Sequence, residues 1–244
     1  RDTKIIEVSD NEIENYVQSP WDLEGVDYLH LTSNETINGV QFREFNKVQH
    51  DSLLIDMSSD IGSYSFEWDN LAYVYAGAQK NMGIPGVSIC IGDEKYLNSE
   101  DNSRYLNLGQ LVEKNSLLNT PPTFSIYVLK LVTDWMIEMG GIKYFEEKSI
   151  RQSSRLYEQL ESYGDFVIIP VSDYSKSRSN IIFKFKNEDL EKKFLIEATE
   201  KGILGLNGHR SQGGIRISLY NSITDEMVDY LSEYIDRFFA DNGK

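Results

Sequence analysis

Short apolar segments separated by polar turns predict alternating strands and helices in the first half of the chain. Segments of strand length occupy residues 26–31, 52–56, 71–75 and 87–91. The last two have the aromatic or β-branched content of buried strands, so we expect Cys90 to be a packing residue. Strands that alternate with helices favour a largely parallel sheet, and the predicted fold class is therefore α/β.

A long helix is predicted to follow these strands. It would begin near Thr120, with two prolines in its first turn, and stop at Gly140 and Gly141. Residues 10–18 could form a short helix, and the polar stretch 92–104 is interpreted as a surface loop. We interpret an apolar stripe on the long helix as core or dimer interface; it contains Phe124, Tyr127, Val128, Leu131, Trp135, Met136 and Met139.

Beyond residue 140 the pattern changes to mixed helices and strands. The predicted elements are a helix at 143–163, a strand at 180–186, a helix at 188–201, a strand at 214–219 and a helix from Asp225. Mixed strands with helices on one side suggest a smaller α+β domain. We therefore expect two domains, residues 1–140 and residues 141–244.

The composition is that of an ordinary soluble globular protein, with 244 residues of which 40% are hydrophobic and 26% are charged. No segment approaches the length of a membrane span, and the N-terminus lacks the features of a signal peptide. The single cysteine excludes an internal disulfide. These features lead us to expect a cytoplasmic protein.

The formal net charge of −15 argues against binding to nucleic acid or to anionic membranes, because both require clustered lysine and arginine. Small anions are not excluded, since a few arginines can gather in one pocket while the remaining charges are screened. Neither His30 nor His50 has a metal-ligand spacing, so we expect no metal.

The candidate chemistry centres on Lys80 and Asp56. Lys80 lies in a glycine-bounded turn between two apolar runs, and an apolar setting makes a lysine amine more nucleophilic. Asp56 ends an apolar run, and strand ends form the edge at which open α/β sheets bind ligands. Pyridoxal phosphate chemistry needs such a lysine and such an acid. From the residues alone, a solvated turn lysine and a structural aspartate remain open alternatives.

Five segments carry a family resemblance, and they occur in the family's order. They are LHLTSNETINGVQF (29–42), LLIDMSSDI (53–61), YAGAQKNMGIPG (75–86), LLNTPPTFSIYVLKLVTDWM (117–136) and GHRSQGGIRISLYN (208–221). Together they resemble the phosphoserine aminotransferases, class V enzymes of fold type I that use pyridoxal 5'-phosphate. The resemblance implies a large domain with a mostly parallel sheet, incomplete at its N-terminus, and a smaller C-terminal α+β domain.

The resemblance also implies roles for the candidate residues. Lys80 would attach the cofactor, and Asp56 would pair with its pyridine nitrogen. The family forms homodimers with shared active sites. The other cofactor contacts that the resemblance implies are Thr36, Gln79 and, for the cofactor phosphate of the neighbouring subunit, Asn119 and Thr120.

A second cluster of candidate residues consists of His209 and Arg210, just before the predicted strand 214–219, and Arg216 within it. Arginine presents a planar fork of donors that matches carboxylates and phosphates. The residues alone also fit two surface arginines and a solvated histidine. The resemblance implies that Arg216 binds the substrate α-carboxylate, and that His209 and Arg210 bind the substrate phosphate across the dimer.

The implied reaction transfers an amino group between glutamate and 3-phosphooxypyruvate, giving O-phosphoserine and 2-oxoglutarate in serine biosynthesis. Members of the family carry a long N-terminal segment before the region at which this chain begins. That segment would hold the cofactor phosphate, so we expect little or no activity from this chain alone. The alternative is a catalytically weak or inactive remnant that retains only dimerisation or partial cofactor binding.

Overall fold

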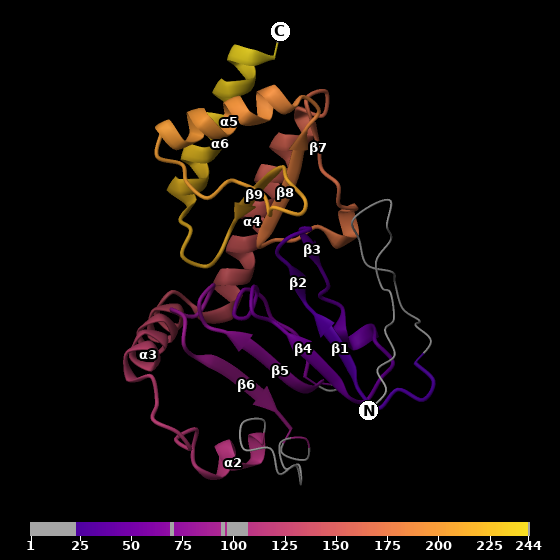
Figure 1. Cartoon of the computed structure of the whole chain (residues 1–244), viewed down its shortest axis with the longest axis vertical. Coiled ribbons are helices and arrows are strands. Elements are labelled where there is room, and N and C mark those ends of the chain that lie inside the picture. Colours follow the sequence, from indigo (N-terminus) through magenta and orange to yellow (C-terminus); the bar gives the residue numbers. More distant parts are fainter. Residues whose placement is uncertain (1–22, 69–70, 94–95, 97–106, 244) are drawn as a thin grey trace. The chain divides into compact units, whose positions relative to one another are not determined.

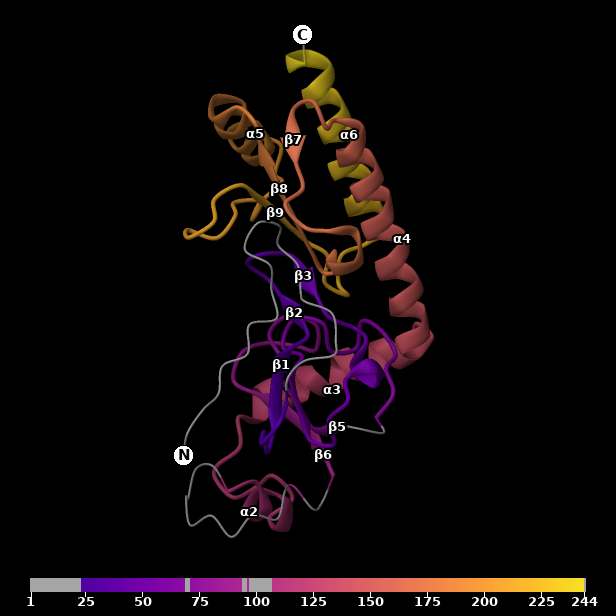
Figure 2. The same cartoon turned by 90° about the vertical axis from the view of Figure 1, so that its right-hand side faces the viewer.

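The structure is a computed structural model that describes residues 23–68, 71–93, 96 and 107–243 (Figures 1 and 2). The helix predicted at residues 10–18 and most of the loop predicted at 92–104 lie outside these residues. The described chain divides into two compact units. Residues 23–33 and Arg43–Ile142 form the first unit, whereas Asn34–Phe42 and the described residues from Lys143 onward form the second.

The first unit contains a four-stranded mixed sheet in the order β1-β4-β5-β6 (Figure 1). The strands β1, β4 and β5 are parallel, and β6 runs antiparallel to β5. The strands predicted near residues 26–31, 52–56 and 71–75 are confirmed, with small shifts at their ends. Their bounds are β1 Leu29–Thr32, β4 Leu53–Asp56, β5 Leu71–Gly77 and β6 Ser88–Gly92.

The two faces of this sheet differ in burial. Alternate residues of β4 and β5, among them Ile55 and Val74, are buried, while Leu54 and Tyr75 between them are only half-buried. The prediction that residues 87–91 form a buried strand is wrong, because β6 consists of exposed and half-buried residues. Cys90 is exposed rather than packed. The apolar content of a segment does not distinguish a central strand from one at the end of a sheet.

Among its described residues, the first unit contains the helical segments η1 Phe45–Lys47, α2 Leu108–Glu113 and α3 Thr123–Glu138. The helix α3 confirms the predicted long helix, although Pro122 caps it instead of lying in its first turn. Gly140 and Gly141, with φ of 115° and 70°, follow its end. Most of the apolar stripe of α3 is not core within the described chain, since Phe124 is 71% exposed, whereas Met136 is buried. Its assignment to a dimer interface stays a prediction.

The second unit contains a three-stranded antiparallel sheet in the order β7-β8-β9, with three long helices. The bounds are β7 Val167–Ile168, β8 Asn180–Phe185, β9 Ile215–Ser218, α4 Gly141–Ser162, η2 Asp173–Ser175, α5 Glu188–Glu200 and α6 Asp225–Asn242. The predicted helices and the two predicted strands are confirmed. No helix in the described part of the chain has both the length and the apolar character that crossing a membrane requires.

Aromatic side chains dominate the core of the second unit. Phe194 of α5 is only 1% exposed, and its ring centroid lies 4.9 Å from that of Tyr234 and 5.1 Å from that of Phe238, both on α6. Phe183 and Phe185 extend this cluster along one face of β8. Such contacts between helices and sheet give this unit a continuous core.

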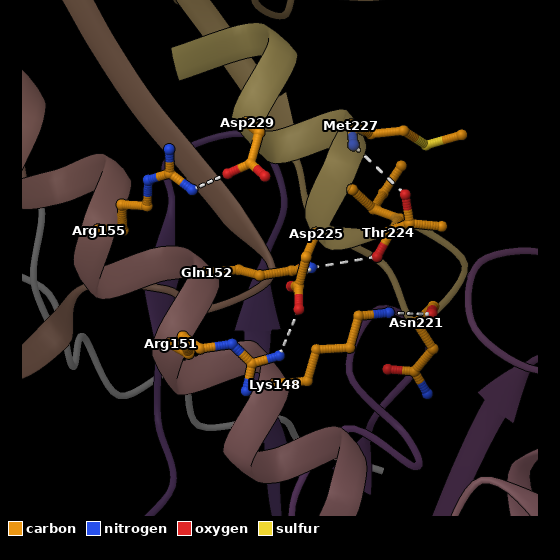
Figure 3. Close-up of polar contacts among 10 residues, drawn as sticks. Lys148, Arg151, Gln152, Arg155, Asn221, Thr224, Asp225, Met227 and Asp229 are labelled. Carbon is orange, nitrogen blue, oxygen red and sulfur yellow. Dashed lines mark hydrogen bonds and ion pairs between the residues drawn. The ribbon is translucent and has the colours of Figure 1, made fainter. Parts of the chain in front are cut away.

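Polar contacts join α4 to the start of α6 (Figure 3). Asp225 accepts hydrogen bonds from Arg151 at 2.7 Å and from Gln152 at 2.8 Å. The hydrogen bond from Gln152, followed by the bond and charge of Arg151, lowers the pKa of the Asp225 carboxyl, although burial opposes the shift. Lys148 donates to the carbonyl oxygen of Asn221 at 2.8 Å, and burial lowers the pKa of its amine.

A β-hairpin that the sequence pattern did not reveal belongs to the second unit. Its strands are β2 Asn34–Glu35 and β3 Val40–Gln41, which pair antiparallel. The side chain of Asn34 donates to that of Asn180 on β8 at 2.9 Å, and the two side chains are 2% and 0% exposed. The domain limits predicted from the sequence assign this hairpin to residues 1–140, whereas the structure groups it with the second unit.

Glycine is required where the hairpin meets β8. A Cβ atom on Gly39 would lie 2.7 Å from Cγ1 of Ile182 and 3.0 Å from the carbonyl oxygen of Asn180. The φ of Gly39 is also positive, at 74°, which side chains disfavour. The absence of a side chain therefore permits the hairpin to approach the sheet.

Candidate active site

Asp56 and Lys80 come from neighbouring strands of the first sheet. Asp56 is the last residue of β4, and Lys80 lies in the turn that follows β5. Because β4 and β5 are parallel and paired, with Asp56 opposite Tyr75, their carboxyl ends lie at the same edge of the sheet. Both Asp56 and Lys80 are half-buried. The structure therefore brings the two predicted residues to one edge.

Backbone hydrogen bonds hold the two strand ends together. The amide of Met57 donates to the carbonyl of Tyr75 at 2.8 Å, and the amide of Gly77 donates to Oγ of Ser58 at 3.1 Å. The amide of Ser58 donates in turn to Oδ1 of Asp56 at 2.9 Å. The Asp56 carboxylate thus has one oxygen held by a rigid backbone group.

Tyr75 is a member of this site that the sequence pattern did not single out. Burial raises the pKa of its hydroxyl, and the negative charge of Asp56 raises it further. Its oxygen also lies 2.9 Å from Nε2 of His30 on β1. The signal that could have found it is the parallel pairing of residues 52–56 with 71–75, which places Tyr75 beside Asp56.

Three other predicted residues of the first unit are exposed. Gln79 lies in the same turn as Lys80, and its side chain is folded over Gly77, since a Cβ there would meet it at 2.5 Å. Asn119 and Thr120 lie in the segment that leads into α3. Of these three residues, Gln79 is the one that lies next to Lys80 in the turn after β5.

The remaining predicted residues belong to the second unit. Arg216 is half-buried on β9, and its Nε is a buried donor with no hydrogen-bond partner among the residues that the structure describes. His209 and Arg210 are exposed in the turn before β9, where Nδ1 of His209 lies 2.8 Å from Oγ of Ser211. Thr36 is half-buried in the turn of the hairpin.

Acidic, histidine and cysteine side chains do not gather into a metal-binding group of three or more anywhere in the described ranges. His30 and His50, which lack a metal-ligand spacing in the sequence, both have hydrogen-bond contacts. His50 lies 3.0 Å from the carbonyl of Val26 and accepts from the amide of Ser52.

Comparison with known proteins identifies the family. The family model described as Aminotransferase class-V matches residues 3–231. The chain belongs to the class-V aminotransferase family. The mixed sheet and helices match the fold of solved aminotransferases of this family, which confirms the predicted fold class.

Phosphoserine aminotransferases are among the class-V members that this chain resembles in sequence and structure. The enzyme of Geobacillus kaustophilus is 42% identical over 213 residues, which cover 86% of this chain and 59% of that protein. The solved structure from Bacillus circulans subsp. alkalophilus is 38% identical, with a TM-score of 0.81, and covers 88% of this chain and 60% of that one. The pyridoxal-phosphate-bound enzyme of Trichomonas vaginalis is 31% identical, with a TM-score of 0.79 and coverage of 86% and 60%. The chain therefore spans about 60% of the length of these relatives.

Proposed function

We propose that this chain is part of a phosphoserine aminotransferase that uses pyridoxal 5'-phosphate. The reaction is amino transfer between glutamate and 3-phosphooxypyruvate, a phosphorylated three-carbon acid. The observation that carries the proposal is the meeting of Asp56 and Lys80 at one edge of parallel strands, in a chain 42% identical to such an enzyme. We further infer a cytoplasmic homodimer that binds neither nucleic acid nor a membrane.

The residues present fit the cofactor. When bound, pyridoxal 5'-phosphate supplies an aldehyde that accepts the amino group and a ring that withdraws electrons. The half-buried Asp56 carboxylate, held at the strand end by the Ser58 amide, suits a cationic ring nitrogen. Lys80 in the neighbouring turn suits the aldehyde. The additional cofactor contacts that we propose are Thr36, Gln79, Asn119 and Thr120.

Lys80 and Asp56 have different tasks in this proposal. The Nζ atom of Lys80 would attach the cofactor, and Lys80 would move the proton at the substrate α-carbon as general base and acid. Asp56 holds the proton on the ring nitrogen by its negative charge, and this effect is strongest in a site that excludes water.

The second unit supplies the substrate contacts. The buried Nε of Arg216 lacks a partner in the described chain, and a guanidinium with an unsatisfied donor suits a carboxylate, which accepts two parallel hydrogen bonds. His209 and Arg210 are exposed on a turn and are proposed to bind the substrate phosphate across the dimer. A phosphorylated substrate explains why a histidine and an arginine adjoin in this turn.

The test measures glutamate-dependent phosphoserine formation by the purified chain with pyridoxal 5'-phosphate. Because the chain spans about 60% of its relatives, the assay is run with and without the N-terminal segment of a relative added as a separate chain. Borohydride reduction and peptide mapping should place the cofactor on Lys80, and a Lys80→Ala chain should show neither adduct nor activity.

Phosphoserine formation in either assay supports the proposal. A chain that binds no cofactor and stays inactive with the added segment would be the inactive remnant, and an adduct on another lysine would contradict the assignment of Lys80.

A further inference from the structure

A buried asparagine joins the two segments that carry the proposed cofactor residues. Asn81 directly follows Lys80 in the turn after β5, and its side chain is only 5% exposed. Its Nδ2 atom donates to the carbonyl oxygen of Ile61 at 3.2 Å and to that of Ser59 at 3.5 Å. Both carbonyls belong to the stretch of chain that follows Asp56. The residue next to Lys80 therefore contacts the chain just beyond Asp56.

The orientation of the Asn81 amide follows from these partners. A backbone carbonyl oxygen only accepts hydrogen bonds, whereas a side-chain amide has two donor protons on its nitrogen and none on its oxygen. The nitrogen must therefore face Ser59 and Ile61, and its two protons match the two acceptors. An oxygen in the same place would be repelled by both carbonyl oxygens. A carboxylate of the same shape therefore cannot make this contact.

This contact differs from the other hydrogen bonds around the turn. The backbone bonds that hold the ends of β4 and β5 together lie before the turn. The Met82 amide donates to the carbonyl of Ala78 at 3.0 Å and so closes the turn on itself. Asn81 instead ties the turn to the stretch that follows β4. It therefore restrains the backbone directly beside Lys80.

We propose that Asn81 is a positioning residue that holds Lys80 at the distance from Asp56 that the cofactor requires. The inference rests on the proposed function, in which both residues bind the same cofactor. The aldehyde and the ring nitrogen of pyridoxal 5'-phosphate lie at opposite ends of a rigid aromatic ring, so the amine and the carboxylate must meet it at one separation. A turn that is held in place before the cofactor arrives loses less freedom on binding.

The test compares Asn81→Ala with Asn107→Ala as a matched control. Asn107 is also a buried asparagine of the first unit, 8% exposed, but its side chain caps α2 by accepting from the amide of Gln110. Each chain receives the N-terminal segment of a relative and pyridoxal 5'-phosphate below saturation, borohydride traps the adducts, and peptide mapping quantifies them. The yield of the Lys80 adduct should fall about tenfold in Asn81→Ala, as expected for one lost hydrogen bond, and stay unchanged in Asn107→Ala.

The other lysines of the same samples separate a change of position from a loss of fold. Lys184 is half-buried on β8 in the second unit, so its modification should be equal in wild type and both variants, whereas unfolding would raise it. Asn81→Asp, which places an oxygen against both carbonyls, should lower the Lys80 yield at least as far as the alanine change. Asn81→Ser, a milder change that keeps one donor, provides the comparison if the alanine variant does not fold.

A second measurement needs no cofactor. Hydrogen exchange at the amides of Ile61 and Met82, one in each of the two joined segments, reports how well these segments are ordered. Both amides should exchange faster in Asn81→Ala and at the wild-type rate in Asn107→Ala.

Two results would overturn the inference: an equal yield of the Lys80 adduct in Asn81→Ala and wild type, or equal losses in Asn81→Ala and Asn107→Ala. A wild-type chain that forms no adduct on Lys80 contradicts the proposed function instead. In that case hydrogen exchange of the cofactor-free chain still decides, because an unchanged rate in Asn81→Ala would show that Asn81 does not hold the two segments together.

Discussion

The two compact units bury their apolar residues differently. In the second unit, α4, α5 and α6 contribute to one continuous core together with the three-stranded sheet. In the first unit, one face of the sheet is buried, while the face with Tyr75 is half-buried and much of the stripe of α3 is exposed. Large exposed apolar residues of the first unit include Leu117, Phe124, Ile126, Tyr127, Leu131 and Ile137.

The proposed cofactor-binding residues and the residues of the large aromatic core lie in different units. The proposed cofactor residues Asp56 and Lys80 lie in the unit whose sheet keeps a half-buried face, whereas Arg216 lies on a strand of the second unit. An exposed apolar stripe larger than a few side chains marks a surface that another part or another chain covers. We therefore expect the binding of a cofactor or a partner chain to change the unfolding free energy of the first unit most. The packing of its own core should determine the unfolding free energy of the second unit.

The largest expected effect comes from the aromatic core. Phe194→Ala should destabilise the chain by about 3 to 5 kcal/mol, because it removes a large side chain and leaves a cavity. Phe124→Ala, the matched change on α3, should alter stability by less than about 0.5 kcal/mol, since that ring is mostly exposed. Urea denaturation measures both. Similar losses of unfolding free energy from the two substitutions would contradict the difference in burial between the two units.

The different roles proposed for Asp56 and Arg216 predict different kinetic effects of their substitution. Asp56→Asn should reduce the turnover of a cofactor-loaded enzyme by about ten- to a hundred-fold, the equivalent of about 1.5 to 3 kcal/mol for one charge-assisted hydrogen bond. Arg216→Lys should mainly raise the KM for glutamate, because lysine lacks the planar fork. Steady-state kinetics separate the two results. Near wild-type turnover in Asp56→Asn would make this residue structural.

A third change tests whether the hairpin belongs to the second unit. Asn180→Ala should cost about 1 to 3 kcal/mol, because it leaves the buried amide of Asn34 without its acceptor. Hydrogen exchange at the hairpin amide of Gly39, which bonds to the carbonyl of Glu35, should accelerate. Unchanged protection there would show that the hairpin is held by contacts other than this asparagine pair.

The smallest effect concerns the contacts between α4 and α6. Asp225→Asn should cost at most about 1 kcal/mol, since the Asp225 side chain is half exposed and solvent screens its pairing. The folded-state pKa of Asp225 lies below the ordinary value of 3.8, so its contribution is present above that pH and is lost as the pH falls through the folded value. The unfolding free energies of wild type and variant should therefore differ at neutral pH and converge at acidic pH. Asp189→Asn, an exposed position in the first turn of α5, is the control.

Local signals were sufficient for most elements. The helices α5 and α6 begin after Asn187 and Thr224, whose side chains accept amide hydrogen bonds as caps, and such residues are readable in a sequence. Asp56 and Lys80 were found because each follows an apolar run. In contrast, the burial of residues 87–91 was misjudged, because apolar composition carries no information on a strand's place in its sheet.

Long-range partners could not be predicted in the same way. Asn34 and Asn180 are 146 positions apart, and nothing in either local sequence specifies the hydrogen bond between them. Tyr75 looked like one of several aromatic residues in a strand until the pairing with β4 placed it beside Asp56. The unsatisfied Nε of Arg216 likewise depends on what packs around β9.

The hairpin also has a consequence for the order of events during synthesis. A ribosome releases Asn34 long before it adds Ser177 and Asn180, so the second unit cannot be completed while its earliest strands emerge. The entropy of closing so long a loop grows only slowly with length, but such distant pairing delays folding. Nascent chains that have not yet reached Asn180 should therefore present the hairpin to chaperones with its polar groups still in water. The speed of translation across residues 42–180 would then decide how long that interval lasts.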